Sequence, residues 1–153
     1  MNFKLFFENS NSNVFYHGSF RIFNNFSSRF PESNDFGYYG FGFYFTPNEK
    51  TARSYGPNLY KCQLNLDNPF VWNGSPESLW EKFDVIDGND SPKNSKQLSK
   101  LLTQKLQQEG YNSIIVKSMD NSKILEICVF DNKDVKILSK QISSDLIDDD
   151  MYS

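Results

Sequence analysis

Two tyrosines and one glutamate in this sequence have the types and surroundings that could act on a small ligand. Tyr44 and Tyr55 are eleven residues apart (55 − 44 = 11) and lie on either side of a predicted helix start. Two aromatic faces can hold a flat aromatic ligand between them by stacking. Glu126 is the lone charge in the apolar run Ile124–Phe130, where an ionised carboxylate is costly unless it faces a cleft or a partner. The tyrosines favour a site that grips a flat ligand, whereas Glu126 could also be a water-facing residue of an edge strand.

Several other kinds of chemistry are not predicted. His17 is the only histidine, and with the distant Cys62 and Cys128 it forms neither a metal site nor a disulfide framework. Ser19 follows His17 by two residues, but the segment lacks the pattern of a nucleophile elbow. The glycines between residues 37 and 42 are spaced G-x-x-G-x-G and precede a predicted strand, whereas the dinucleotide fingerprint G-x-G-x-x-G follows one. The sequence therefore predicts no metal, no serine nucleophile and no Rossmann-type site.

The composition predicts one domain with an aromatic core. The chain has 153 residues, a net charge of −3 and an aromatic content of 16%, with 15 Phe and 8 Tyr. Such rings bury much area each, so a compact core can form despite the polar average. Residues 141–153 hold four aspartates and no Lys or Arg, and without them the charge is −3 + 4 = +1 with no basic patch to follow a phosphate backbone. Nucleic acid is therefore not a favoured partner.

Targeting and membrane signals are also not predicted. The N-terminal apolar run is too short for a signal peptide, and Glu8 interrupts it. No segment approaches the length of a membrane span. A cytoplasmic protein, of the producing cell or of a host cell, is the expectation.

The elements that must position the candidate residues are short. Residues 14–17 form a predicted strand that stops at Gly18 and Ser19, and residues 43–45 form another. Thr46 can cap a following helix, with Pro47 at the first helical position and Glu49 completing a capping box. We expect two or three helical turns that end near residues 55–57, where glycine and proline stop the helix.

The rest of the chain alternates between strand and helix patterns. Residues 59–66 alternate as in a half-buried strand, and four leucines between residues 98 and 106 recur at helical spacing before Gly110. Further predicted elements are a strand within 1–13, a short helix and loop in 20–39, a turn at 67–69, a short helix at 77–83, strands at 114–117 and 124–130, and a turn at 120–122. This order predicts an α+β domain over residues 1–140, followed by an acidic, mobile tail at 141–153.

Three segments together resemble a known family. "FYHGS", "GFGFYFTPNEKTARSY" and "LEICVFD" are similar, in order and spacing, to the motifs of the diphtheria-toxin-like and poly(ADP-ribose) polymerase-like ADP-ribosyltransferases. That class carries a His-Tyr-Glu triad, and its second segment has a second tyrosine eleven residues after the first. Small bacterial and phage-borne members also resemble this chain in "LDNPF" and in an aspartate that closes the glutamate strand. The resemblance spans Phe15–Asp131 and implies the single-domain split β-sheet core of that superfamily, with a few flanking helices.

The resemblance implies NAD as co-substrate, without a metal, and a role for each matching residue. Tyr55 would stack on the nicotinamide ring while Tyr44 forms the other wall, helped by cation–π attraction because the ring is positively charged. The backbone of Gly18 would bind the carboxamide, since a glycine allows close approach, and His17 would bond the adenosine ribose. Ser19 and Thr51 are weaker candidates for polar contacts.

The chemistry implied for Glu126 is electrostatic. Nicotinamide leaves as a neutral ring, so its departure requires no general acid, and an oxocarbenium-like ribose develops as in glycoside hydrolysis. One carboxylate near that sugar can stabilise the charge and bond the 2′-hydroxyl. Glu126, Tyr44 and His17 are therefore the expected catalytic residues.

The reaction type and acceptor follow only by analogy. Arginine-directed relatives carry a Ser-Thr-Ser segment and Glu-x-Glu, which this chain lacks. Its length leaves no room for the accessory domains of chain-elongating polymerases. The resemblance implies mono-ADP-ribosylation of a macromolecular acceptor, a protein, by a phage or bacterial effector, with a host or competitor protein or a defence complex as target. The alternatives are an NAD glycohydrolase and a non-catalytic module that binds NAD or ADP-ribose.

Overall fold

The computed structural model describes residues 14–27, 39–85 and 95–143. In chain order these form β1 (Val14–Ser19), β2 (Phe43–Phe45), α2 (Glu49–Arg53), β3 (Asn58–Leu64), β4 (Pro69–Trp72), α3 (Pro76–Lys82), α4 (Ser95–Gln108), β5 (Ser113–Lys117), β6 (Ile124–Val129), the 3-10 turn η1 (Asn132–Asp134) and β7 (Val135–Gln141). The prediction of a mixed α and β architecture is confirmed, since the described ranges contain two sheets and three α-helices, whereas the split core of the family stays a prediction.

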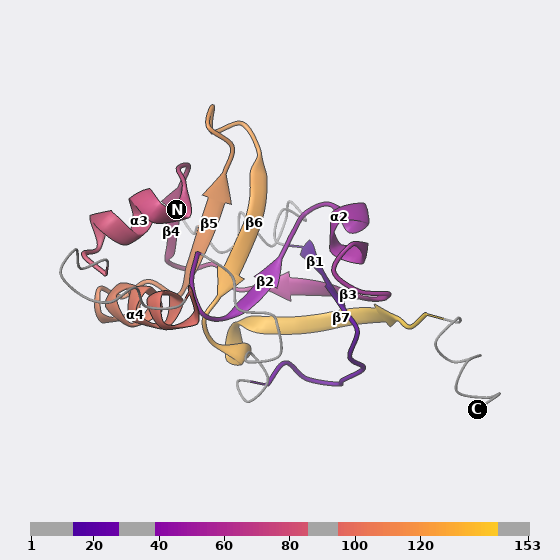
Figure 1. The fold of residues 1–153 in the computed structure, drawn as a ribbon. Helices are drawn as coiled ribbons and strands as arrows, with labels where there is room; N and C mark the ends of the chain where they lie inside the picture. Colours follow the sequence, from indigo (N-terminus) through magenta and orange to yellow (C-terminus); the bar gives the residue numbers. More distant parts are fainter. Residues whose placement is uncertain (1–13, 28–38, 86–94, 144–153) are drawn as a thin grey trace, which may run out of the picture.

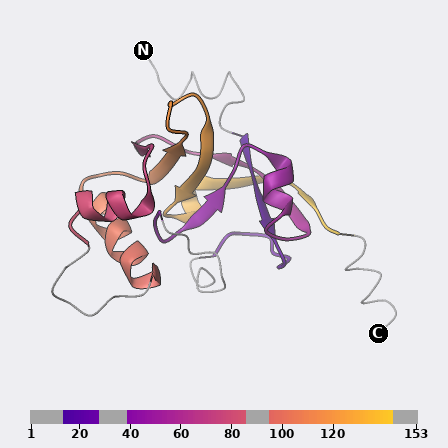
Figure 2. The ribbon, with the colours of Figure 1, turned by 45° about the horizontal axis from the view of Figure 1, so that its top comes forward.

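The strands form a three-stranded and a four-stranded sheet. The first has the order β1-β3-β7 and is antiparallel throughout. The second has the order β2-β6-β5-β4, in which only β4 and β5 run parallel. In Figure 1 the strands of one sheet run across those of the other, with α2 beside β1 and with α3 and α4 at the far end of the four-stranded sheet. Figure 2 places the helices in the same way from a second direction.

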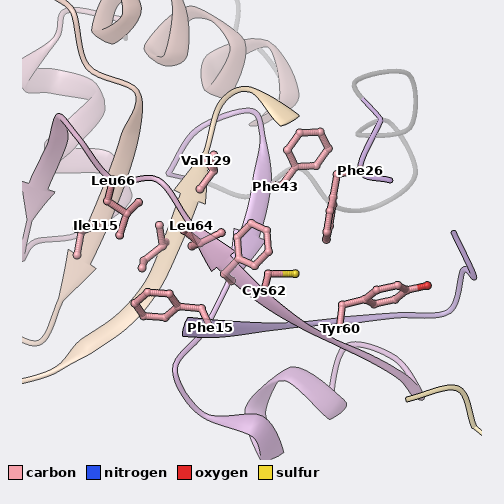
Figure 3. Packing of buried hydrophobic residues seen from close by; sticks show 11 residues of the cluster. Phe15, Phe26, Phe43, Tyr60, Cys62, Leu64, Leu66, Ile115 and Val129 are labelled. Atoms are coloured by element: carbon pink, nitrogen blue, oxygen red, sulfur yellow. The ribbon is translucent and has the colours of Figure 1, made fainter. Parts of the chain in front are cut away.

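One hydrophobic core lies between the two sheets. It draws Phe15 from β1 and Phe43 from β2, and its other members come mainly from β3, β5 and β6, as Figure 3 shows. Along β3 the buried side chains alternate with Lys61 and Gln63, as its sequence pattern predicts. Phe43 and Phe45 both enter this core, on the face of β2 opposite Tyr44. This packing sets the orientation of Tyr44.

A second core fills the other face of the four-stranded sheet. Leu102 and Leu106 of α4 and Leu79 of α3 are fully buried there, against Ile114 and Cys128. The leucine spacing in residues 98–106 therefore predicts the buried face of α4 correctly, and Gly110 follows the helix with a φ of +95°. No helix in the described part of the chain is long and apolar enough to cross a membrane.

The helix after β2 begins later than its capping pattern predicts. Asn48 is the N-cap, and its side chain accepts the N–H of Thr51 at 2.9 Å. Thr46 is not the cap, because its backbone is paired with Tyr16 and its hydroxyl accepts the N–H of Asn48 at 3.2 Å. As a result Pro47 precedes the helix, which has five residues rather than two or three turns.

Two strands lie outside the predicted pattern. β4 begins within the turn predicted at 67–69 and continues where no strand is predicted, and β7 adds an edge strand for which the sequence suggested nothing. Residues 20–27 contain no helix, and residues 28–38 of the same prediction lie outside the described ranges. The helix predicted at 77–83 is present as α3. The predictions for residues 1–13 and for the acidic part of the tail lie outside the described residues, and β7 itself runs to Gln141.

Candidate functional site

Tyr44 is held firmly in β2. It is paired with Cys128 of β6, and its hydroxyl donates to the carbonyl of Gly40 at 2.7 Å. The ring is half-buried and packs against the second core. Burial raises the pKa of Tyr44 well above its ordinary value, and the thiol of Cys128 and the carboxyl of Glu126 raise it further. Tyr44 is therefore a neutral, fixed aromatic wall within electrostatic range of Glu126.

Glu126 lies on the same face of the sheet as Tyr44. Residues two apart in a strand share a face, so Glu126 is on the side of Cys128 and hence of Tyr44. Its neighbours in register are Val116 of β5 and, one strand further, Trp72 of β4. The side chain is half-buried, and burial raises the pKa of its carboxyl. A partly desolvated carboxylate is suited to stabilise a developing positive charge.

The chain crosses from one sheet to the other next to these residues. The N–H of Tyr16 in β1 donates to the carbonyl of Thr46 at 2.8 Å, and the reverse bond measures 2.9 Å. Directly paired residues and residues two apart share a face. By that alternation Gly18 lies on the side of β1 that corresponds to the face of Tyr44 and Glu126. The alternation thus puts residues from three distant motifs on matching sides of their strands, with β1 in one sheet and β2 and β6 in the other.

The backbone of Gly18 is directed away from the neighbouring strand. Backbone groups of residues two apart point to the same edge of a strand. Those of Tyr16 point to Thr46, so the N–H and C=O of Gly18 point to that edge too, away from β3. The pairing between β1 and the β2 segment has ended at this point, because the chain after Thr46 leads into α2. An amide of a ligand could bond both groups there.

Two glycines bring α2 against the end of β1. A Cβ on Gly18 would lie 1.7 Å from the carbonyl oxygen of Ala52 in α2. A Cβ on Gly56 would lie 2.3 Å from the carbonyl carbon of Ser19 and 2.6 Å from the backbone nitrogen of Phe20. Neither position can hold a side chain without movement of a backbone. We call this contact the glycine seam of Gly18 and Gly56.

His17 lies in the core between the sheets. Its side chain is 5% exposed, and Nδ1 is 2.7 Å from the carbonyl oxygen of Tyr44. The ring makes an edge contact with Phe26 at 4.9 Å and lies 5.6 Å from Phe45, between ring centroids. His17 is thus in direct contact with the strand of Tyr44, but its ring is on the opposite face from the Tyr44 side chain.

The remaining candidates lie around α2. The hydroxyl of Ser19 is buried and accepts the N–H of Arg21 at 2.9 Å. Thr51 is exposed on α2, and its N–H is used by the Asn48 cap. Tyr55 follows the helix with 63% of its surface exposed. The glycine seam therefore fixes the backbone next to Tyr55, at Gly56, while the Tyr55 ring remains open to solvent.

Tyr39 is a neighbour of this site that the sequence patterns did not single out. Its hydroxyl donates to the carbonyl of Gly74 at 3.1 Å. Burial raises the pKa of Tyr39, and the carboxyls of Glu126 and Glu77 contribute in that order. Tyr39 thus lies within electrostatic range of both carboxylates. The available signal was its place immediately before the glycines of residues 40–42.

A comparison with protein families gives one match. A family described as "ADP-Ribosyltransferase in polyvalent proteins" matches residues 8–144. The chain belongs to this family. Membership of this family supports a transferase activity, and the family uses NAD as its substrate.

Other comparisons give less. One solved structure, described as "Crystal structure of an anti-CRISPR protein", is similar with a TM-score of 0.49 and 19% identity, over 84% of this chain and 94% of that one. No curated protein matches. Within the described residues of this chain, no group of three His, Cys, Asp or Glu side chains could hold a metal ion.

Proposed function

We propose that the protein transfers a single ADP-ribose from NAD to a protein acceptor and releases nicotinamide. The observation that carries this proposal is that strand alternation puts Gly18, Tyr44 and Glu126 on matching sides of three separate strands. Membership of an ADP-ribosyltransferase family supports the same reaction class. The bond between nicotinamide and ribose breaks, nicotinamide leaves with the electron pair, and an acceptor nucleophile bonds the ribose and loses a proton.

Glu126 is proposed to stabilise the charge that develops on the ribose. Its carboxylate is half-buried, so its field is screened less than that of a surface group. Burial raises its pKa, which means that the ionised form is a cost to the free protein. A positive charge that forms beside it relieves this cost, and this makes the interaction strongest in the transition state.

The nicotinamide is proposed to lie between Tyr44 and Tyr55. Tyr44 offers a fixed wall, because its hydroxyl is bonded to Gly40, and Tyr55 offers an exposed ring. The N–H and C=O of Gly18 are directed so that a carboxamide could bond both.

Other residues are proposed to serve the rest of NAD. Contact of His17 with the adenosine ribose stays a prediction, because its ring is buried in the core on the face opposite the Tyr44 side chain; its Nδ1 contact ties it to the strand of Tyr44. Thr51 is exposed on the helix that carries the Tyr55 wall and would add a polar contact. Ser19 is the weaker candidate, because its hydroxyl already accepts a backbone N–H.

The acceptor is proposed to be a protein of a host or competitor cell. This step rests on the resemblance of the three motifs to small phage and bacterial effectors, and it is an analogy. The defence complex proposed as one such target is testable by the same labelling experiment, because mass spectrometry identifies the modified chain.

The decisive experiment is incubation of the protein with a bacterial lysate and NAD labelled in its adenosine half. Released nicotinamide and labelled protein are measured separately. Glu126→Gln is the test variant, and Glu109→Gln, an exposed glutamate just after α4, is the matched control. We expect labelled protein with the parent and with Glu109→Gln, and a strong loss with Glu126→Gln.

Each other outcome contradicts the proposal in a distinct way. Nicotinamide release without labelled protein would identify an NAD glycohydrolase. NAD binding by calorimetry without nicotinamide release would identify a non-catalytic module. No binding of NAD, ADP-ribose or nicotinamide to the folded protein would overturn the assignment of the site.

A further inference from the structure

A buried threonine of α4 is bonded to the segment that leads into β2. Thr103 is 6% exposed and lies beside Leu102 in the second core. Its hydroxyl accepts the N–H of Phe41 at 2.8 Å and donates to the carbonyl of Phe41 at 3.4 Å. One hydroxyl can donate once and still accept, so both bonds can exist together. Lys100, one turn earlier on α4, lies over the Phe41 ring with Nζ 4.9 Å from its centroid.

These partners are unusual for a threonine inside a helix. Such a hydroxyl normally bonds to a carbonyl of its own helix, three or four residues earlier. The bonds of Thr103 instead reach a residue 62 positions earlier in the chain. A purely apolar residue would fill the same place in the leucine-lined core. The hydroxyl is therefore explained by its bonds to the Phe41 backbone.

The segment that Thr103 bonds, residues 40–42, is also closely packed on the side away from Thr103. Gly40 has a φ of +149°, which favours glycine, and a Cβ there would lie 3.2 Å from the Thr103 hydroxyl oxygen. A Cβ on Gly42 would lie 2.3 Å from the carbonyl oxygen of Val129 in β6. The backbone of residues 40–42 is thus confined between α4 and β6.

The confined segment also supplies the partner of Tyr44. The carbonyl of Gly40 accepts the Tyr44 hydroxyl at 2.7 Å. Thr103 accepts the N–H of the Gly40–Phe41 peptide, which is the same planar unit as the Gly40 carbonyl, and it donates to the C=O of the next peptide. It therefore fixes the direction of the Gly40 carbonyl. A contact chain runs from Thr103 through the Phe41 backbone and the Gly40 carbonyl to the ring of Tyr44.

We propose that Thr103 is a positioning residue that sets the orientation of Tyr44 through the Gly40–Phe41 backbone. The consequence for NAD rests on the proposed function, in which Tyr44 is one wall of the nicotinamide site. Thr103 itself touches neither substrate nor reacting atoms. Its removal loosens the wall and weakens NAD binding more than it slows the bound reaction.

The test compares one substitution that removes the hydroxyl with one that keeps it. Thr103→Val keeps the shape and removes the hydroxyl, and Thr103→Ser keeps the hydroxyl. We expect Thr103→Val to raise the KM for NAD about tenfold, with kcat reduced less than about threefold, since a displaced contact far from the chemistry can cost that much or more. Thr103→Ser should restore KM to within about twofold of the parent. A merely structural role would lower the active fraction, and so kcat, without changing KM.

A second measurement does not depend on activity. The tyrosines are labelled with ¹³C at Cζ, and the Tyr44 signal is assigned by its loss in Tyr44→Phe. Thr103→Val should shift or broaden this signal, and Thr103→Ser should leave it in place. An unmoved Tyr44 signal in folded Thr103→Val would overturn the inference. If the signal moves but no protein, the parent included, uses NAD, the positioning role stands and the proposed function fails.

Discussion

The two tyrosine walls of the proposed site are built in opposite ways. Tyr44 belongs to the segment of residues 40–45, where its hydroxyl is bonded, its ring is half-buried and its backbone is confined by two glycines. Tyr55 belongs to the segment of residues 49–57, where the backbone is fixed by the glycine seam but the ring is 63% exposed. The fold thus completes one wall before any ligand arrives and leaves the other to be ordered by it.

This difference has an energetic consequence. An interaction already made in the free protein adds to folding stability and does not have to be ordered on binding. An exposed ring loses rotamer freedom when it stacks on a ligand, and it also loses contact with water. Changes to the Tyr44 ring should therefore alter stability and binding together, whereas changes to the Tyr55 ring, as opposed to its backbone, should alter binding alone.

The largest expected effect breaks the backbone that supports the second wall. Gly18→Ala places a methyl group 1.7 Å from the Ala52 carbonyl oxygen, where backbone and not a flexible side chain must move. We expect a loss of about 3 kcal/mol or more in the free energy of unfolding, measured by denaturant titration. Gly110→Ala is the control, since its Cβ has space and only its positive φ is unfavourable, so about 1 kcal/mol is expected. Equal losses in the two variants would mean that α2 can move away from β1.

The next effect separates chemistry from both walls. Glu126→Gln keeps the size and removes the charge, so the single-turnover rate of transfer should fall about a hundredfold or more. NAD affinity should change by less than about tenfold, because the interaction is made mainly in the transition state. The melting temperature should hold or rise, since a carboxylate with an unfavourable environment has been removed. A variant that transfers ADP-ribose as fast as the parent would reduce Glu126 to a surface residue.

Local patterns in the sequence predict much of the frame around the walls. The leucine repeat predicts α4, the alternation in residues 59–66 predicts β3, and period two places Phe43 and Phe45 opposite Tyr44. These features depend on neighbours within a few residues. They persist because burial in the two cores acts in the same direction as the local preference.

Features set by distant partners were not predictable in the same way. β4 has four residues and is paired in parallel with β5, which lies beyond two helices. β7 is an edge strand in which Lys and Ser leave only Val135 and Ile137 at the core. Thr46 has a good capping sequence, but its pairing with Tyr16 moves the cap to Asn48.

The candidate site shows the same division. The motif residues could be chosen from their spacing, but the roles of Tyr39 and Thr103 depend on contacts made across the fold. The seam role of Gly18 and Gly56 likewise requires α2 to be seen against β1. The sequence suggested a ligand for Gly18 and a helix end for Gly56. Neither local pattern indicates that α2 packs against β1 at these two glycines.

A pair of alanine substitutions sharpens the comparison directly. Tyr55→Ala should weaken binding of NAD or nicotinamide by about 1–3 kcal/mol, the range for one stacking ring, and change folding stability by less than about 0.5 kcal/mol. Tyr55→Phe should keep most of the binding. Tyr44→Ala should weaken binding and also destabilise the fold by about 2 kcal/mol, because it removes a packed ring and leaves the Gly40 carbonyl without its bond. Calorimetry and denaturant titration on the same samples give both quantities. If both alanine variants change stability equally, the walls do not differ as described.

The smallest effect is a pH dependence of rate and stability that comes from the Glu126 carboxyl, on the Tyr44 side of the site. Burial raises the pKa of Glu126 above its ordinary value of 4.5. Catalysis requires the carboxylate, so the transfer rate should fall on acidification with a midpoint above 4.5.

The pH dependence of folding stability has the opposite sign, because between the unfolded and folded pKa values of Glu126 the folded state binds more protons. The contribution of Glu126 to stability is therefore fully present below its unfolded pKa and is lost as pH rises through the folded pKa. The melting temperature of Glu126→Gln should exceed that of the parent at pH 7, and the difference should shrink toward pH 4 as the parent carboxyl takes up its proton. A difference that stays constant from pH 7 to pH 4, or a rate midpoint at or below 4.5, would show that the Glu126 carboxyl is solvated like a surface group.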